Sequence, residues 1–277
     1  MDLSVIIVSW NVKDKLRSNL AALFSSFSPY KFEVFVVDNA SSDGSAEMVS
    51  SEFKQVRLIE NRVNAGFARA NNQAFRQASG RYILLLNPDM KVEGDTLAKM
   101  LDWAEANPQA VVSGCRLTDE AGRLVRQVRR FPRFFDQLLV TLKVPHLFPH
   151  SIDRYLAADF DYDRAAAVDS IRGAFFLINR VAYKRLSDGQ EPELDERYFV
   201  WFEEVDFCRT VRELGGQIWY TPVAGCLDYV GASFKQIKRR QGQDYFSDSM
   251  LKYFAKWHTP WETSVLRLAW RIIKVFV

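Results

Sequence analysis

Short apolar runs alternate with stretches of helical periodicity in the N-terminal part of this 277-residue chain. The apolar runs that predict strands cover residues 3–10, 33–37, 56–60, 82–86 and 111–114. The helical patterns between them cover residues 12–27, 45–53, 65–78 and 95–106. Strands separated by helices of this length indicate βαβ units. We therefore expect an α/β fold, with a Rossmann-like, mostly parallel sheet flanked by helices.

The regular alternation of apolar runs and helical patterns ends in the second half of the chain. Residues 116–133 are rich in arginine and carry a turn signal at 119–122, which predicts an exposed hairpin. Residues 143–166 lack clear periodicity, and we expect a mobile loop or lid there. Further strands are predicted at 171–178, 217–220 and 226–230, with a helix at 203–214 that ends at Gly215 and Gly216. The tail beyond Ser233 has a helical pattern.

Polar side chains follow three of the predicted strands at the point where each strand ends. They form the segments 9–11, 38–39 and 87–89. Ligands of parallel α/β sheets bind outside the carboxyl ends of the strands. These segments therefore predict a binding site at one edge of the sheet.

The composition of the chain excludes several kinds of binding site. Hydrophobic residues make up 48% of the chain and the net charge is +3, so one large core is feasible and general nucleic-acid binding is not indicated. Three widely spaced cysteines predict reduced thiols rather than a disulfide framework. With only three histidines, a metal site must use carboxylates, which favours Mg²⁺ or Mn²⁺.

Membrane association is predicted only for the tail. The apolar run at residues 3–8 is too short for a signal peptide, and no stretch approaches the roughly 20 apolar residues that span a bilayer. We therefore expect a cytoplasmic protein. In the tail, Arg267, Arg271 and Lys274 share one helical face and apolar residues cover the opposite side, with Trp257, Trp261 and Trp270 suited to an interface. A tail that lies on the inner face of the cell membrane and a terminal helix that packs on the domain both fit this pattern.

Six segments, taken in order, resemble family 2 glycosyltransferases and, within them, the branch of bacterial rhamnosyltransferases. They are residues 4–11, 37–45, 64–72, 84–89, 172–176 and 202–209. The resemblance covers about residues 3–233 and implies a GT-A fold. It further implies a nucleotide-binding half at about 1–115, an acceptor half at about 116–233 and a helical tail at 234–277.

The resemblance assigns the strand ends to the donor, a dTDP- or UDP-sugar. It implies that Asp38 accepts a hydrogen bond from the pyrimidine ring, although an Asp in this position can also simply initiate a turn. The residues predicted to bind the nucleotide sugar are Ser9, Asn11, Asp38, Asn39, Asn64, Gly66, Asn72 and Asn87. The helix that follows Asn64 can face phosphate or ribose with its N-terminus, or be an ordinary capped helix.

The metal assignment also comes from the resemblance. Asp89 occupies the position of the acidic metal motif, and asparagine replaces the first aspartate of that motif at Asn87. Many relatives carry a histidine shortly before a Gly-rich serine motif, and Asp228 stands in that place here. Asp228 is then either a second ligand for Mg²⁺ or Mn²⁺ or a structural residue.

Three carboxylates crowd the start of the predicted helix at 203–214, directly after the apolar residues 199–202. Negative charge there also suits the helix dipole. Carboxyls beside apolar rings have raised pKa values, which suits a general base. The resemblance makes Glu204 the base, where relatives more often carry aspartate, and Glu203 and Asp206 complete the catalytic group. Glu203 is expected to cap the helix or orient a substrate hydroxyl. Asp206, two residues after Glu204 and off its helical face, is expected to position the helix or bind acceptor.

The acceptor is expected to bind in the acceptor half, at about residues 116–233. The residues predicted to bind it are Arg172, Gly173, Ala174 and Trp201. The arginines of residues 116–133, together with Lys235, Lys238, Arg239 and Arg240, either hold an anionic acceptor such as a lipid diphosphate or form a solvated surface.

The activity expected from these residues is metal-dependent, inverting transfer of a sugar, L-rhamnose from dTDP-rhamnose, to a cell-envelope glycan or lipid-linked acceptor. Two alternatives remain at this point. A sugar-nucleotide nucleotidyltransferase would need a glycine-rich loop after the first strand, and residues 9–12 contain no glycine. A catalytically silent binding protein with the same fold is kept open by Asn87 and Asp228.

Overall fold

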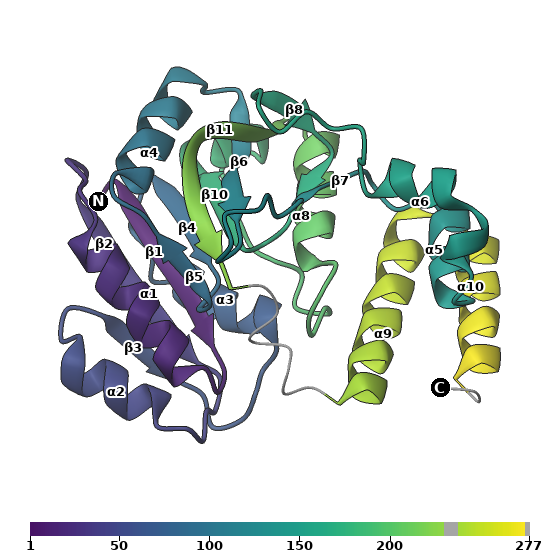
Figure 1. The fold of residues 1–277 in the computed structure, drawn as a ribbon, viewed down its shortest axis with the longest axis horizontal. Coiled ribbons are helices and arrows are strands. Elements are labelled where there is room, and N and C mark those ends of the chain that lie inside the picture. Colours follow the sequence, from purple (N-terminus) through teal and green to yellow (C-terminus); the bar gives the residue numbers. More distant parts are fainter. Residues whose placement is uncertain (230–237, 275–277) are drawn as a thin grey trace.

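The computed structural model describes residues 1–229 and 238–274. Among these residues, a mixed sheet with the strand order β3-β2-β1-β4-β10-β6-β11-β5 forms the centre, and β8 pairs with β11. Figure 1 shows the sheet flanked by helices, with α9 and α10 forming a separate layer at the C-terminal end. The strands are β1 (Leu3–Ser9), β2 (Phe32–Asp38), β3 (Arg57–Glu60), β4 (Tyr82–Leu86), β5 (Met90–Val92), β6 (Ala110–Thr118), β7 (Val128–Arg129), β8 (Ala166–Val168), β9 (Ser170–Ile171), β10 (Phe175–Asn179) and β11 (Gln217–Asp228).

The four strands β3, β2, β1 and β4 are parallel. Their carboxyl ends form the edge that is predicted to bind the donor, which we call the donor edge. The strands are near-continuous apolar runs because helices cover both faces of the sheet. In β1 every residue is buried, and its last residue, Ser9, lies opposite Asp38 at the end of β2. The predicted βαβ units and the convergence of the polar strand ends are confirmed.

Helices in the first half connect these strands and bury the two faces of the sheet. The described helices are α1 (Lys13–Ser25), α2 (Ser45–Glu52), α3 (Phe67–Phe75), α4 (Thr96–Ala106), α5 (Phe134–Thr141), η1 (Pro145–Leu147), α6 (Pro149–Tyr155), α7 (Arg180–Leu186), α8 (Glu203–Glu213), α9 (Arg239–Trp257) and α10 (Pro260–Ile273). Side chains of α1, α2 and α4 pack on one face, and side chains of α3, α7 and α8 on the other.

The second half of the sheet departs from a purely parallel order. Strand β10 is antiparallel to both of its neighbours, β4 and β6, whereas β6 and β11 are parallel. The two short strands predicted at 217–220 and 226–230 form one strand, β11, with an irregularity in register between Tyr220 and Gly225. The turn chemistry there bends the strand without ending its pairing. Val230 lies outside the described residues.

Two predicted loops are wrong in part. Residues 143–166 contain η1 and α6 and lead into β8, so part of the expected lid is helical, with Pro149 at the first helical position. The expected hairpin at 116–133 forms only at its tip, where Thr118 bridges Leu124. Beyond it, Gln127 and Val128 are buried, and β7 pairs with β9.

The tail is two helices, and it packs on the domain. Helix α9 ends at Trp257, and a capping box between Thr259 and Glu262 starts α10. A separate apolar cluster joins this tail to the rest of the chain. Its buried members are Tyr198, Phe202, Met250, Tyr253, Phe254 and Leu266. Ser233 and Lys235 lie outside the described residues.

Candidate active site

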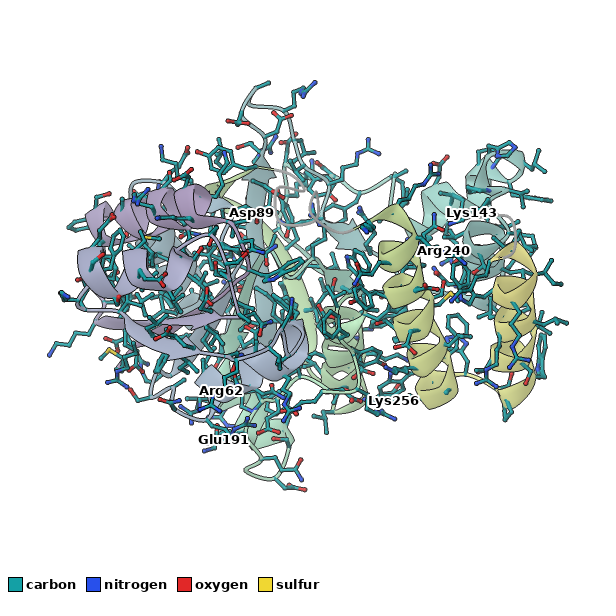
Figure 2. All side chains as sticks on the ribbon, turned by 90° about the horizontal axis from the view of Figure 1, so that it is seen from below. Arg62, Asp89, Lys143, Glu191, Arg240 and Lys256 are labelled. Carbon is teal, nitrogen blue, oxygen red and sulfur yellow. The ribbon has the colours of Figure 1, made fainter. Side chains whose placement is uncertain are left out.

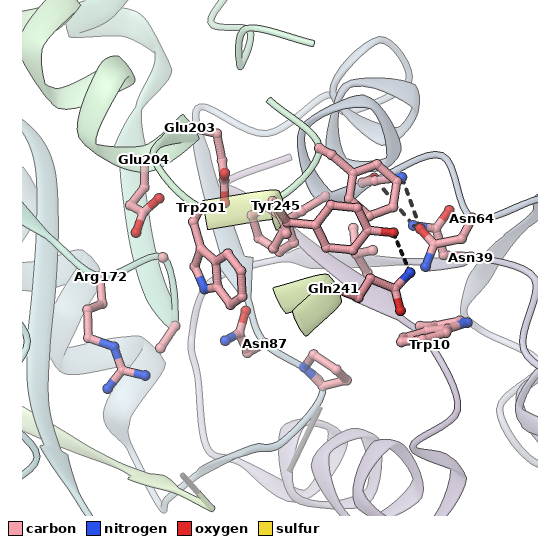
Figure 3. A pocket seen from close by; sticks show the side chains of 18 residues that line it. Trp10, Asn39, Asn64, Asn87, Arg172, Trp201, Glu203, Glu204, Gln241 and Tyr245 are labelled. Atoms are coloured by element: carbon pink, nitrogen blue, oxygen red, sulfur yellow. Dashed lines mark hydrogen bonds between the residues drawn. The ribbon is translucent and has the colours of Figure 1, made fainter. Parts of the chain in front are cut away.

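A pocket of about 440 Å³ lies between the donor edge of the sheet and the start of α8 (Figure 3). Most of the residues predicted to bind the donor, to bind the acceptor or to act in catalysis line this pocket. The predicted residues that line it are Asn39, Asn64, Gly66, Asn87, Arg172, Gly173, Ala174, Trp201, Glu203 and Glu204. Side chains from both halves of the chain therefore meet in one cavity.

Ser9 and Asp38 lie at the adjacent ends of β1 and β2. Asp38 is buried, and its Oδ2 accepts a hydrogen bond from the backbone N–H of Ser41 at 2.9 Å. Its Oδ1 and the Oγ of Ser9 are buried and have no hydrogen-bond partner among the described residues. Buried polar atoms are rarely left unpaired in a native protein. Two such atoms at the carboxyl edge of a parallel sheet suit a polar ligand.

An amide network holds the next part of the donor edge. Asn39 Nδ2 donates to Asn64 Oδ1 at 2.9 Å, and Asn64 Oδ1 also accepts from the N–H of Gly66 at 3.0 Å. Gly66 has a φ of 85°, and a Cβ there would lie 2.6 Å from the carbonyl oxygen of Phe199. That carbonyl accepts a hydrogen bond from Phe67 N–H. Only glycine lets the segment before α8 approach α3 this closely.

The turn at Asn87 is fixed from three sides. Asn19 Nδ2 donates to the Asn87 carbonyl at 2.8 Å, the Asn87 N–H donates to Ala174, and Met90 N–H closes the turn at 3.2 Å. Figure 3 shows the Asn87 side chain inside the pocket. Asn11, which does not line the pocket, accepts a hydrogen bond from Ser42 N–H at 2.6 Å and thereby joins the loops after β1 and β2.

Glu203 and Glu204 begin α8 and face the pocket (Figure 3). One oxygen of each carboxylate, Oε2, is buried without a hydrogen-bond partner among the described residues. Burial raises the pKa of Glu204, while the positive charges of Arg172 and Arg129 oppose that rise. Burial and the negative charge of Glu204 raise the pKa of Glu203 well above its usual range. The pKa of each member of this pair is therefore raised, mainly by burial, which suits a general base at the start of α8.

Strained backbone precedes these carboxylates. Trp201 and Phe202 both have left-handed φ values, 65° and 69°. Such conformations cost about 1–3 kcal/mol for residues other than glycine and persist where the surrounding packing imposes them. Phe202 is buried in the apolar cluster that joins the tail to the domain. This packing aims the start of α8 into the pocket.

The two predicted metal ligands lie on neighbouring chain segments. Asp228 is opposite Met90 in the β5–β11 pair, and the Asp89 carbonyl accepts from Tyr229 N–H at 3.1 Å. Both side chains are buried, and neither residue lines the pocket itself. Asp228 forms an ion pair with Arg172 at 3.3 Å. Over residues 1–229 and 238–274, no three acidic, histidine or cysteine side chains form a metal-binding group.

Two predicted site residues do not line the pocket and make hydrogen bonds within the protein. Asn72 is fully buried and exchanges two hydrogen bonds with the backbone of Leu194, so it holds the segment before α8 and does not line the pocket. Asp206 also lies off the pocket. Its carboxylate accepts from Lys256 at 2.7 Å and from the Trp257 indole at 2.6 Å, which ties α8 to α9. Asn72 lies on α3 and Asp206 on α8, and both side chains are buried.

Sequence reasoning missed the contribution of α9. Gln241 and Tyr245 line the pocket, and Gln241 Nε2 donates to the Tyr245 hydroxyl at 2.8 Å. The Tyr245 ring packs on Phe199 with ring centroids 4.6 Å apart. Figure 3 shows both α9 residues reaching over the donor edge. No local pattern could identify them, because their role depends on where the tail folds back.

A comparison with protein families decides the class of this site. The model for glycosyl transferase family 2 matches residues 4–161, more than half of the chain. The chain belongs to this family. Its members transfer sugars, and the nucleotidyltransferase alternative is thereby set aside. The pocket is accordingly the candidate active site of a glycosyltransferase.

Similar sequences include two rhamnosyltransferases that match over most of their length. Rhamnosyltransferase WbbL of Escherichia coli is 26% identical over 233 residues, which cover 81% of this chain and 82% of that protein. An N-acetylglucosaminyl-diphospho-decaprenol L-rhamnosyltransferase of Mycobacterium tuberculosis is 24% identical over 82% of this chain and 76% of that protein. The uncharacterized glycosyltransferase YfnE of Bacillus subtilis is 36% identical over 116 residues, but the match spans only 30% of YfnE.

Solved structures confirm the GT-A fold. The mannosyltransferase PcManGT of Pyrobaculum calidifontis, in complex with GDP-Man and Mn²⁺, has a TM-score of 0.59 at 18% identity, covering 96% of this chain and 68% of that one. S. aureus TarS 1-349 in complex with UDP-GlcNAc has a TM-score of 0.58 at 17% identity, covering 91% of this chain and 65% of that one. The glycosyltransferase fold thus extends to nearly the whole chain, including its helical C-terminus.

Proposed function

We propose that this glycosyltransferase inverts configuration as it transfers L-rhamnose from dTDP-rhamnose to a hydroxyl of a cell-envelope glycan or lipid-linked sugar. One observation carries the proposal. A carboxylate pair with raised pKa values faces, across one pocket, the amide side chains of Asn39, Asn64 and Asn87. Ser9 and Asp38, which have unpaired buried atoms, end the neighbouring strands and do not themselves line the pocket. Support for rhamnose comes from the two rhamnosyltransferases, one of which acts, by its name, on a lipid diphosphate.

The residues of the chain divide the reaction between them. Asp38 and Ser9 bind the pyrimidine nucleotide with their unpaired atoms, and Asn87 orients the ribose end of the donor. Glu204 removes the proton of the acceptor hydroxyl as its oxygen attacks the anomeric carbon. The bond from that carbon to the nucleoside diphosphate breaks on the opposite side, so configuration inverts.

The carboxylates at the strand ends fit a divalent cation. Mg²⁺ is usually held by one or two carboxylates, with waters and substrate phosphates completing its shell. Asp89 and Asp228 provide such a pair on hydrogen-bonded segments, and a group of three protein ligands is not required. Bound Mg²⁺ or Mn²⁺ would neutralise charge on the departing diphosphate as a Lewis acid.

The metal proposal has a direct test. EDTA should abolish transfer, Mn²⁺ or Mg²⁺ should restore it, and Asp89→Ala should not be restored. Asp228→Ala should raise the metal concentration that gives half-maximal activity. Full turnover in EDTA would contradict the proposal.

The donor is tested by measuring transfer and hydrolysis with a panel of nucleotide sugars. We expect dTDP-rhamnose to be consumed fastest, with UDP-sugars slower. Glu204→Gln serves as the matched inactive control. Preference for a purine nucleotide sugar would refute the donor assignment, and absence of hydrolysis with every donor would favour a silent binding protein.

We also propose that the tail holds the protein on a membrane surface. The tail residues that would contact the membrane differ in part from those predicted from the sequence. Leu266 and Ala269 are buried, so they do not face a membrane. The exposed apolar residues of α10 are Trp261, Val265, Leu268 and Ile272, which follow one another at helical spacing. Phe135, Leu147 and Phe148 add to them from the neighbouring segment, where Phe134 packs on Trp261 with ring centroids 4.9 Å apart.

Basic side chains border this apolar surface. Lys143, Arg267 and Arg271 are exposed. Figure 2 shows Lys143 and Arg240 on the same side of the helical end of the molecule. An apolar surface with a cationic border suits an anionic bilayer. In the described part of the chain, no helix is both long enough and apolar enough to span a bilayer.

Vesicle flotation tests this surface. Leu268→Ser together with Ile272→Ser should reduce recovery with anionic vesicles, while Val181→Ser, an exposed apolar residue on α7, should not. Equal recovery of all variants would refute it. A concentration-dependent dimer that the double variant abolishes would instead assign the surface to a second copy of the chain.

A further inference from the structure

Two arginines lie on the same face of a small ribbon beside the pocket. Strand β7 pairs with β9, with Arg129 opposite Ser170 and Val128 opposite Ile171. The pairing continues where the Arg172 N–H donates to the Gln127 carbonyl at 3.2 Å. Val128 and Ile171 point into the core. Because side chains alternate along a strand, Arg129 and Arg172 both lie on the opposite face.

Arg129 has no carboxylate partner in the part of the chain that the structure describes. Its Nη1 donates to the backbone carbonyl of Val128 at 2.7 Å. Nearby arginines do have such partners, since Arg130 pairs with Asp159 and Arg116 with Asp163. Burial, together with the positive charges of Arg172 and Arg126, lowers the pKa of Arg129. A partly buried guanidinium next to other cations is unfavourable until an anion joins it.

The arginine pair is adjacent to the proposed base. Gly173 follows Arg172 directly, and a Cβ at Gly173 would lie 3.7 Å from the Cβ of Glu204. Arg172 and Glu204 both line the pocket, and Figure 3 shows them on the same side of it. The charges of Arg172 and Arg129 both act on Glu204. An anion bound here would therefore lie next to the acceptor hydroxyl.

We propose that Arg129 and Arg172 bind a phosphate group of the acceptor beside the hydroxyl that Glu204 deprotonates. The guanidinium group is planar and donates paired N–H bonds to phosphate oxygens, which a lysine cannot do. The inference rests on the proposed function and deepens it, because it makes the acceptor a glycosyl phosphate or diphosphate rather than a neutral glycan. Arg172 also pairs with Asp228, a proposed metal ligand, so its substitution would affect the donor side as well. Substitution of Arg129 therefore gives the more specific test of acceptor binding.

A binding experiment tests this subsite without relying on turnover. The full chain is first saturated with dTDP and Mn²⁺ to fill the donor site, and hexyl diphosphate is then titrated by calorimetry. Arg129→Gln should weaken hexyl diphosphate binding by roughly tenfold to a hundredfold, the effect of losing a charge-assisted hydrogen bond. Arg130→Gln removes a cation at the next position and should leave the affinity unchanged. Equal affinity in wild type and Arg129→Gln, or no saturable binding by the wild type, would overturn the proposal.

Kinetics then separate binding from an indirect effect on the base. Arg129→Gln should lower kcat/KM for a sugar diphosphate acceptor much more than for the matching methyl glycoside, and Arg130→Gln should change neither value. An equal loss with both acceptors would mean that Arg129 acts only through Glu204 and would overturn the phosphate assignment. A protein that binds hexyl diphosphate but hydrolyses no sugar nucleotide would refute the proposed function and leave this subsite standing.

Discussion

The donor side and the acceptor side of the pocket are built in different ways. On the donor side, Ser9 and Asp38 end adjacent parallel strands, and the loops that follow are tied by local hydrogen bonds. The acceptor side combines the two-residue strands β7 and β9, the left-handed residues Trp201 and Phe202, and α9 from the end of the chain. The donor side follows from the sheet, whereas the acceptor side depends on tertiary packing.

This difference indicates how each side tolerates change. The strands of the donor edge are held by a continuous ladder, so removing one polar side chain there should affect a ligand more than the fold. On the acceptor side, the carboxylates are aimed by strained backbone and by contacts between α8 and α9. Substitutions there should change catalysis or stability before they change nucleotide affinity.

The largest expected effect is on the acceptor side, at the base. Glu204→Gln preserves size and hydrogen bonding but removes basicity, so kcat should fall by roughly 10²–10⁴-fold with donor affinity nearly unchanged. Steady-state kinetics and nucleotide titration of the same preparation measure both quantities.

Glu203→Gln is the matched control, because Glu203 is the neighbouring carboxylate at the start of α8 and also lines the pocket. It should cost less activity than Glu204→Gln. Loss of activity in Glu203→Gln with normal turnover in Glu204→Gln would exchange their roles. Normal turnover in both variants would reject the mechanism.

The next largest effect concerns stability. Asp206 is buried and binds Lys256 and Trp257, so Asp206→Ala leaves a lysine without its nearest partner and an indole N–H unpaired. Breaking a buried pair by removing one partner costs about 3–5 kcal/mol. Lys256 keeps Asp195 at 3.5 Å, so a value near the lower end is expected.

Chemical denaturation of Asp206→Ala and of Asp248→Ala measures this cost. Asp248 forms only an exposed pair with Lys252 on α9 and should contribute little. An unfolding free energy of Asp206→Ala equal to that of the wild type would show that α8 and α9 are not joined through this carboxylate.

The sequence predicted the donor side well because its signals are local. Alternating strands and helices place the polar ends of parallel strands at one edge, and the structure confirms that edge with Ser9 opposite Asp38. Recognition of the family supplied the roles of individual residues, such as the pyrimidine contact at Asp38, which no spacing could provide. Those roles stay predictions.

The acceptor side was predicted less well, for physical reasons. Asp206 and Glu204 are two residues apart on one helix, so the sequence places Asp206 off the face of Glu204, but it does not identify α9 as the element that Asp206 binds. Tyr245 enters the pocket because the tail folds back over 40 residues after α8 begins, which no local pattern encodes. The buried ribbon at Val128 was hidden within an arginine-rich stretch that is typical of a solvated surface.

A smaller effect is expected on the donor side. Asp38→Ala removes the buried oxygen that we assign to the pyrimidine ring, and nucleotide affinity should fall by roughly tenfold. The melting temperature without ligand should fall only slightly, because Oδ1 has no partner among the described residues and the substitution removes one hydrogen bond, from the Ser41 N–H to Oδ2. Calorimetry with dTDP measures the affinity. Asp43→Ala is the matched control, because it removes a loop carboxylate just before α2 that accepts hydrogen bonds from the Lys13 backbone N–H and from Ser45. Equal dTDP affinity in Asp38→Ala and wild type would remove Asp38 from the site.

The smallest expected effect is a shift in pH dependence, and it links the two arginines to the base. Glu204 must be ionised to accept a proton, so kcat/KM should rise as pH increases through its pKa. Burial raises that pKa above its ordinary value of 4.5, and the charges of Arg172 and Arg129 limit the rise. Arg129→Gln removes one of these charges, so the pKa of Glu204 should increase and the acidic limb of the profile should move to higher pH. With a methyl glycoside as acceptor, which has no phosphate to lose, this shift should be visible without a large drop in the plateau rate. Arg130→Gln should leave the limb in place, and an acidic limb that stays fixed in Arg129→Gln would mean that Glu204 is not the titrating group.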